Sequence, residues 1–331
     1  MSAYQPKPTK YGRSLPKQAG YYGRPVIKKS HWLWEIIVYF FVGGVAGGSS
    51  VVAAVASRFG TEEDEPVVRT GRYLALLGAI VSPILLILDL GIGRRFHHML
   101  RIFKTRSPMS VGSWILAGFG SFTGLAAGVQ AARDGLLGVG RLAGLLAAMP
   151  GWFMDGMGSL FGFFLSGYTG VLLTGTAIPL WSKAKRYMGP LFLTSALSTA
   201  VAAISFILSL GNSTPDSTME KLKRTEKVAL LSELGLLLAL KQHLGRTGDP
   251  LWNGRHAGLT RFFVGGGLIT PLLLHFSSDG LGRRMSRLFT IVSSILVLAG
   301  GFAMRYAVIM AGHDSADDPE ALFDMQSNSR D

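Results

Sequence analysis

Long apolar stretches alternate with short polar segments along most of the chain. A stretch of about 18 or more apolar residues is long enough to cross the ~30 Å hydrocarbon core of a bilayer as a helix. The pattern predicts eight such spans, over residues 32–57, 73–92, 112–132, 158–181, 190–210, 227–244, 261–277 and 287–311. The expected fold class is therefore all-α, a polytopic membrane helical bundle of about eight transmembrane helices.

The stretch 135–150 is also apolar, but it is short and Arg141 interrupts it. We expect a re-entrant or interfacial helix there and not a ninth span. Trp32 and Trp34 open the first span and Trp181 closes the fourth. Tryptophan is enriched where a helix meets the membrane interface, so these positions agree with the predicted span ends.

Composition supports a membrane protein and limits its chemistry. The 331 residues are 48% hydrophobic and 16% charged, with a mean hydropathy of +0.34, whereas soluble domains are roughly 25% charged. The chain contains no cysteine, which excludes disulfides and cysteine-ligated iron–sulfur or zinc sites. If this protein takes part in electron transfer, another subunit or a diffusible carrier must hold the electrons.

The net charge of +13 suggests nucleic acid at first sight, but the Lys and Arg residues lie between apolar runs. With eight spans, 20 of these cations fall on the side of both termini and 12 on the other. The positive-inside rule then places both termini on the cytoplasmic side of the membrane. We expect the protein to lie in the inner membrane of the cell. We expect a basic tail over 1–31, a membrane domain over 32–311 and an acidic tail over 312–331. The basic tail serves as an orientation signal or as a docking strap for an acidic partner.

An ionisable residue inside the membrane costs ~2.5–3.5 kcal/mol on insertion scales and is a functional candidate. Two carboxylates of this kind lie near the ends of predicted spans. Glu35 lies in the first turn of span one, either as a carboxylate that favours the helix dipole or as a proton acceptor beside a lipid-soluble substrate. Asp89 lies at the end of span two, either in a structural salt bridge or as a carboxylate of a proton path or quinone site.

Three further ionisable residues lie within the later spans. Glu233 has no cation four residues away, so its partner must come from another helix, which favours a proton path or ion site. Arg305 is a candidate partner for Glu233 or for Asp89. His275 is interpreted as an interfacial or hydrogen-bonded core histidine. Because it is the one histidine clearly inside a span, the four axial ligands of a membrane dihaem cytochrome are lacking, and we expect no haem.

Four residues are candidates for binding a quinone headgroup, chosen from their position and chemistry. His31 and Tyr168 can donate hydrogen bonds to the carbonyl oxygens. Trp34 lies at the interface beside His31, and His97 follows span two. His97 and His98 are adjacent, so in a helix they point about 100° apart and cannot both face one site.

Several motifs resemble the NrfD/PsrC family, the membrane subunits of polysulfide-reductase-type complexes. They occur in the family's order over residues 32–311. The motifs are Trp34–Gly48 in the first helix, Leu88-Asp89-Leu90-Gly91 with Arg95–Leu100, Ser107-Pro108-Met109-Ser110, Tyr168–Trp181 in the fourth helix, and Gly300–Tyr306 in the last. One departure is that Ile92-Gly93 stand before Arg94, and the proline usual after that turn is missing.

The resemblance implies a haem-free, quinone-reactive subunit that uses menaquinone or ubiquinone and contains no iron–sulfur cluster of its own. It also implies an iron–sulfur, ferredoxin-like partner that serves a catalytic subunit, often a molybdopterin enzyme. Asp89 and Arg305 match family positions in the proton-conducting or quinone-proximal interior. The chain is then one subunit of an oxidoreductase complex and not a complete enzyme.

Quinol oxidation releases two electrons and two protons, and the protons need an acceptor. A carboxylate in a membrane cavity suits this task, which makes Asp89, Glu35 and Glu233 candidate proton carriers. Two alternatives stay open. Glu233, Arg305 and the glycine-rich helices also fit a transporter or proton channel, and the altered turn after Asp89 also fits a membrane anchor that lacks the quinone site.

Overall fold

The computed structural model describes residues 30, 32–90, 93–138, 140–211, 214–278 and 282–317. These residues form helices and their connections, with no strand in the described ranges. Eight helical segments are long and apolar enough to cross a membrane: Trp34–Phe59, Glu62–Asp89, Pro108–Arg133, Gly151–Thr174, Lys185–Leu210, Asp216–Trp252, Ala257–Ser277 and Arg283–Ser315. The predicted fold class is confirmed.

Twelve α-helices and four short helical pieces make up the described chain. The α-helices are α1 (Trp34–Phe59), α2 (Glu65–Asp89), α3 (Pro108–Arg133), α4 (Arg141–Ala147), α5 (Gly151–Thr174), α6 (Pro179–Lys183), α7 (Lys185–Leu210), α8 (Asp216–Leu244), α9 (Asp249–Trp252), α10 (Ala257–Phe262), α11 (Thr270–Ser277) and α12 (Arg283–Ser315). The 3-10 helices are η1 (Glu62–Asp64), η2 (Gly93–Leu100) and η3 (Gly245–Gly248), and the π-helix is η4 (Phe263–Ile269).

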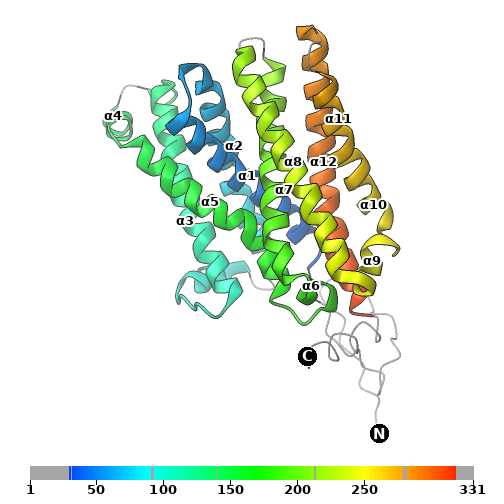
Figure 1. Cartoon of the computed structure of the whole chain (residues 1–331). Coiled ribbons are helices and arrows are strands. Elements are labelled where there is room, and N and C mark those ends of the chain that lie inside the picture. Colours follow the sequence, from blue (N-terminus) through cyan, green and yellow to red (C-terminus); the bar gives the residue numbers. More distant parts are fainter. Residues whose placement is uncertain are drawn as a thin grey trace.

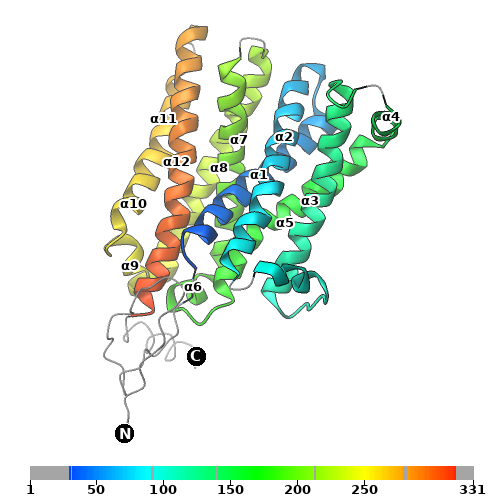
Figure 2. The ribbon, with the colours of Figure 1, turned by 180° about the vertical axis from the view of Figure 1, so that it is seen from behind.

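The spanning helices form two groups that meet along α1, α5 and α7. Helices α1, α2, α3 and α5 pack together as the first group, and α7, α8, α10–α11 and α12 form the second. Helix α1 runs obliquely between them (Figures 1 and 2). At Gly47 on α1 and Gly162 on α5 the two backbones approach so closely that a Cβ on either would overlap the other. Small residues at such crossings let membrane helices pack without a gap.

Helix α8 begins at Asp216, well before residue 227, where apolar character predicts the sixth span to start. Lys223 and Glu226 lie in the added turns, yet both are buried by neighbouring helices. Their side chains bond to polar groups on α11 and α12. The seventh span is interrupted by π-helix η4, and α12 extends to Ser315.

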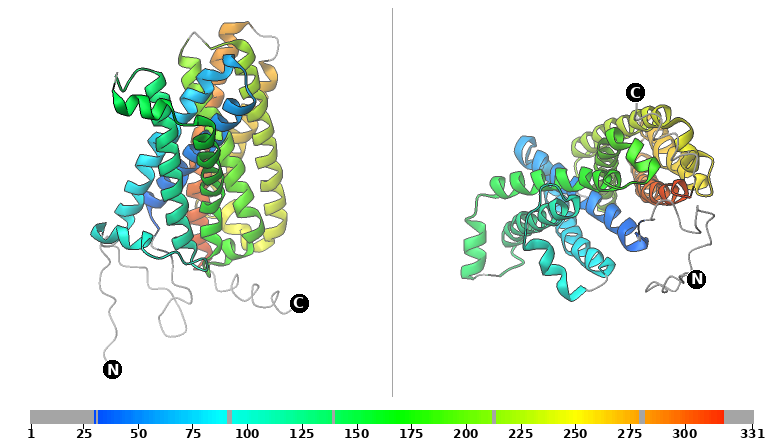
Figure 3. Two further views of the ribbon diagram at one scale, coloured as in Figure 1. Left: turned by 90° about the vertical axis from the view of Figure 1, so that its left-hand side faces the viewer. Right: turned by 90° about the horizontal axis from the view of Figure 1, so that it is seen from below.

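The stretch 135–150 does not cross the bundle. It contains α4, which is only 7 residues long and extends sideways from the ends of α3 and α5 (Figure 3). Leu136 and Leu145 are largely exposed. An exposed apolar surface beside the end of a membrane bundle is typical of a helix in the interface, as the sequence predicts.

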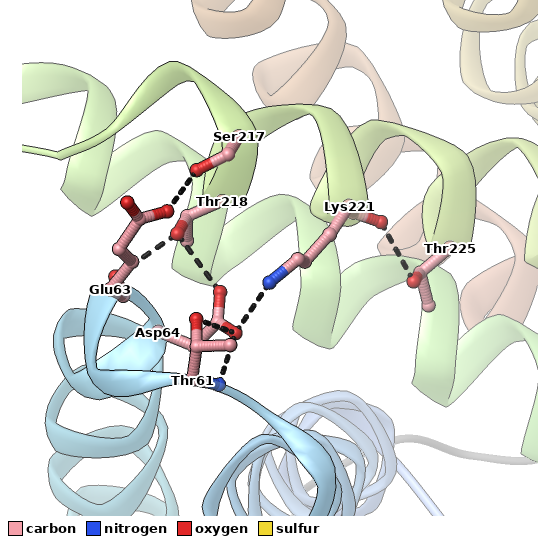
Figure 4. A network of polar contacts seen from close by, with 7 residues as sticks. All are labelled: Thr61, Glu63, Asp64, Ser217, Thr218, Lys221 and Thr225. Carbon is pink, nitrogen blue, oxygen red and sulfur yellow. Dashed lines mark hydrogen bonds and ion pairs between the residues drawn. The ribbon is translucent and has the colours of Figure 1, made fainter.

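A polar clamp joins the two helix groups at the end away from the start of α1 (Figure 4). Asp64 of η1 accepts hydrogen bonds from the Thr61 backbone N–H (2.9 Å) and the Thr218 hydroxyl (2.9 Å), and it pairs with Lys221 (2.7 Å). The Thr218 hydroxyl also donates to the Glu63 carbonyl (3.0 Å). Since Thr218 and Lys221 lie on α8, the clamp ties the α1–α2 connection to the second group.

Replacing Asp64 by alanine is expected to lower the free energy of unfolding by about 1–3 kcal/mol, because four donors, including the Thr61 hydroxyl (3.3 Å), lose their acceptor. Exposed Glu62 in the same η1 turn is the matched control, and Glu62→Ala should change stability by less than about 0.5 kcal/mol. Thermal unfolding in detergent and hydrogen exchange of the first α8 turns measure both variants. Equal stability of the two variants would show that the clamp contributes little.

Candidate functional site

The packing register of α1 and α2 brings two candidate carboxylates to the same level. Gly78 packs on Ala46 in this antiparallel pair. Both helices rise 1.5 Å per residue, so counting 11 residues from each contact leads to Asp89 on α2 and Glu35 on α1. Glu35 is 5% exposed although it lies in the first turn of its helix. No hydrogen bond or ion pair joins its carboxylate to another residue in the described ranges.

Tyr39 lies one turn above Glu35 on the same face of α1, because residues four apart stack on a helix surface. It is 2% exposed, and its ring lies beside Gly43, opposite the buried Ser82 of α2. The Ser82 hydroxyl has no hydrogen-bond partner among the described residues. Sequence reasoning missed Tyr39, although its spacing from Glu35 was a usable signal.

Tyr168 on α5 is held against the start of α3. Its hydroxyl donates to the backbone carbonyl of Pro108, and its ring covers Gly112 so closely that a Cβ there would overlap it. The Tyr168 phenol also lies close enough to Tyr39 for the two to interact electrostatically. The start of α1, the end of α2, the start of α3 and the later part of α5 therefore converge at this end of the first group.

The other predicted headgroup ligands are placed less favourably. His97 and His98 lie on η2 with exposed side chains, and their rings make an edge contact with centroids 4.5 Å apart. Trp34 is 58% exposed and points away from the bundle, whereas Trp32 is 7% exposed and stacks on Trp181 at 5.6 Å. His31 lies outside the described residues.

Arg305 and Glu233 lie in the second group, on the side of α1 away from α2. Arg305 is fully buried, and its Nε donates to the Phe40 carbonyl of α1 (3.1 Å). Its Nη1 donates to the Ser195 hydroxyl of α7 (3.2 Å). Glu233 accepts a hydrogen bond from Ser198 (2.8 Å), which lies one turn from Ser195 on α7. The two residues thus approach each other through α7, and the structure shows no direct ion pair between them.

A second polar network occupies the opposite end of the first group. Arg72 on α2 donates to both carboxylate oxygens of Asp155 on α5 (3.0 Å for Nε–Oδ1) and to the amide oxygen of Gln130 on α3. All three side chains are buried. A cavity of about 320 Å³ opens beside Asp155. It lies away from Glu35, so the cavity and the converging carboxylates are separate features.

The network continues to Asp134, just after α3 ends. Gln130 donates to its carboxylate (3.1 Å), as does the Tyr73 hydroxyl (2.6 Å), and Arg69 forms an ion pair with it (2.9 Å). Burial alone would raise the pKa of Asp134, but these hydrogen bonds and the Arg69 charge hold that pKa below its usual value. Asp134 is therefore an ionised anchor at physiological pH.

A family model described as "Polysulphide reductase, NrfD" matches residues 26–315, which is most of the chain. The chain belongs to the NrfD family. The C subunit of the polysulfide reductase of Wolinella succinogenes is 27% identical over 310 residues, which cover 85% of this chain and 94% of that protein. The resemblance seen in the sequence motifs is confirmed, and with its eight apolar helices this NrfD-family chain is a multi-pass membrane protein.

Proposed function

We propose that this NrfD-family chain is the quinone-reactive membrane subunit of a respiratory oxidoreductase complex. In this proposal it exchanges electrons with an iron–sulfur partner that serves a catalytic subunit of the molybdopterin type. The observation that carries the proposal is the convergence of Glu35, Asp89, Tyr39 and Tyr168 at one end of the first helix group. The family relationship and the likeness to a polysulfide reductase subunit support it.

The residues at this end fit the chemistry of a quinone headgroup. A quinone, menaquinone or ubiquinone, supplies two-electron, two-proton redox chemistry when bound. The Tyr39 hydroxyl is a donor for one carbonyl oxygen, and the Tyr168 hydroxyl is a donor for the other when it exchanges its hydrogen bond to the Pro108 carbonyl for the headgroup. Glu35 is buried with no bonded partner among the described residues, so its carboxylate is available to hold a proton. Asp89, at the same level on α2, is the second proton carrier.

Electron exchange requires the partner to dock close to the headgroup, which places it on the face where α1 begins. The positive-inside count assigns that face to the cytoplasmic side of the inner membrane. His97 and His98 on exposed η2, together with Trp34, lie at this face. In this proposal they belong to the entrance of the site and to the partner surface.

The test is quinone-dependent oxidation of reduced methyl viologen by the purified complex. Glu35→Gln is expected to lower kcat by about 100-fold or more, because the carboxyl group that delivers a proton to the quinone during its reduction is lost. Tyr168→Phe removes one headgroup donor and should raise KM for dimethylnaphthoquinone by about tenfold. Glu62→Gln, an exposed change at the far end, should behave as wild type.

Other outcomes distinguish the alternatives. Ser159→Phe fills the cavity beside Asp155. Loss of quinone turnover in that variant alone would indicate that the headgroup binds in this cavity and not beside Glu35. Wild-type turnover in Glu35→Gln, Asp89→Asn and Tyr168→Phe would identify the chain as a membrane anchor. Proton flux by the isolated chain in liposomes, with no redox partner, would identify a channel or transporter.

A further inference from the structure

Helix α8 carries a buried ionisable face that the proposed quinone site does not use. Lys223, Glu226 and Glu233 are 7%, 0% and 1% exposed. A charge inside the membrane is costly to insert, and such residues usually face a functional interior. These three face α7, α11 and α12, so they line the interior of the second helix group.

The first cluster on this face lies toward the end opposite the start of α1. Glu226 Oε1 lies 3.2 Å from His275 Nε2 on α11. The Ser293 hydroxyl of α12 bridges them, at 3.4 Å from Glu226 and 3.0 Å from His275. One turn nearer that end, Lys223 donates to Ser286 (2.6 Å). The carboxylate and the imidazole are thus positioned to share one proton.

The second cluster reaches α1. Glu233 bonds to Ser198, and Ser198 also donates to the Ser195 carbonyl (3.1 Å). The Ser195 hydroxyl accepts from Arg305, whose Nε bonds to the Phe40 carbonyl. Phe40 lies in the second turn of α1, close after Glu35. The cluster therefore ends at α1, the helix that carries the proposed proton carrier Glu35.

The two clusters lie about 10 Å apart along α8, because Glu226 and Glu233 are separated by two helical turns and share one face. Each carboxylate has a buried oxygen with no hydrogen-bond partner in the described ranges, Oε2 of Glu226 and Oε1 of Glu233. The buried hydroxyl of Ser294 on α12 also has no hydrogen-bond partner among the described residues. Buried polar atoms of this kind normally bond to ordered water.

We propose that Glu226, His275 and Glu233 form a proton relay through the second helix group. It connects the membrane face opposite the start of α1 with the proposed quinone site, on which this inference rests. A proton passes from water to the Glu226–His275 pair and then through bridging water to the Glu233 carboxylate. From Glu233 it passes through further water past Arg305 to Glu35, which protonates the quinone as it is reduced, and each donor regains its proton from the previous group. Quinone reduction consumes two protons for two electrons, and the viologen-reduced partner supplies the electrons.

Arg305 is a positioning residue in this relay and not a carrier. A guanidinium does not deprotonate in proteins, so its charge stays fixed. It holds the Ser195 hydroxyl toward Glu233 and stabilises the Glu233 carboxylate after the proton leaves. Charged groups near the outer end of the relay include Lys223, Arg287, Glu220 with Arg224, Lys227 over the Phe276 ring, and Arg283 with Asp216.

The experiment uses the whole complex in liposomes with a pH dye trapped inside. External reduced methyl viologen, which does not cross the bilayer, addresses molecules whose iron–sulfur partner faces out. Dimethylnaphthoquinone is the acceptor. The wild type should make the lumen alkaline during turnover. Glu226→Gln and His275→Gln should slow this luminal proton uptake at least about tenfold, with KM for the quinone unchanged.

Glu220→Gln is the matched control, since it is the same substitution on the same helix at an exposed position. It should take up protons like the wild type. If Glu226→Gln fails to assemble, His275→Gln and Ser293→Ala provide the test. A larger solvent isotope effect on turnover in these variants is a readout that a purely structural role would not produce. Luminal uptake at the wild-type rate in the assembled variants would overturn the relay.

Failure of the proposed function looks different. The wild-type complex would then show no quinone-dependent viologen oxidation at all. In that case a potassium gradient with valinomycin creates a membrane potential that drives protons across the same vesicles. Proton flux that is present in the wild type and abolished in Glu226→Gln would support the relay without the quinone site. Equal proton flux in the wild type and Glu226→Gln would overturn the relay.

Discussion

Replacing Asp155 by alanine is expected to lower the free energy of unfolding by about 3–5 kcal/mol, because Arg72 is left as an unpaired buried charge. The pair joins α2 to α5, and through Gln130 it also holds α3. Both partners are nearly inaccessible, with side chains 4% and 5% exposed. Reversible unfolding of the purified protein in mixed micelles measures the loss.

The double variant Arg72→Met with Asp155→Leu is the control for this prediction. Removing both charges eliminates the uncompensated guanidinium, so the double variant should recover much of the stability that Asp155→Ala loses. A single variant within about 0.5 kcal/mol of the wild type would show that water or lipid headgroups satisfy Arg72 without its partner.

Arg305→Lys is expected to destabilise the packing of α1 on α12 by about 2 kcal/mol or more, despite keeping the charge. The guanidinium uses separate nitrogens for the Phe40 carbonyl and the Ser195 hydroxyl. It also lies over the rings of Phe41 and Phe192, 5.7 Å from each centroid. A lysine ammonium is a point donor and cannot reach these groups together. Thermal unfolding and protease resistance of α1 report the change.

The matched control for this variant lies at the start of the same helix. Arg283 pairs with Asp216 at 3.1 Å, but both side chains are more than two-thirds exposed. Exposed pairs contribute little, so Arg283→Lys should shift stability by less than about 0.5 kcal/mol. Equal tolerance of lysine at both positions would show that charge alone, and not the fork of the guanidinium, matters at Arg305.

The spans could be predicted from the sequence because a bilayer sets the length of an apolar helix. The relay on α8 could not. Residues 216–227 contain seven charged side chains, so their low hydropathy predicts a loop outside the membrane. Lys223 and Glu226 become interior only because α11 and α12 cover them. The sequence places His275 in a span, but hydropathy places its carboxylate partner Glu226 outside the spans.

The candidate site was predictable as a set of residues but not as an arrangement. Glu35 and Asp89 were named from their position near span ends, yet their shared level depends on the register set by small residues such as Gly78 and Ala46. Periodicity also did not distinguish Trp32, which faces inward against Trp181, from Trp34, which faces outward. Which of two nearby aromatics is buried depends on the tertiary neighbours.

The π-helix η4 links chain length to the chemistry of the second group. Such a segment holds more residues per turn than an α-helix, and here the Thr270 hydroxyl bonds back to the Gly265 carbonyl, five residues earlier (2.9 Å). If the same residues wound as an α-helix instead, the residue that the wider turn absorbs would rotate everything beyond it by about 100°. His275 would then point away from Glu226. The π-helix therefore sets the phase of α11, and we expect related chains that lack it to lack one residue here as well.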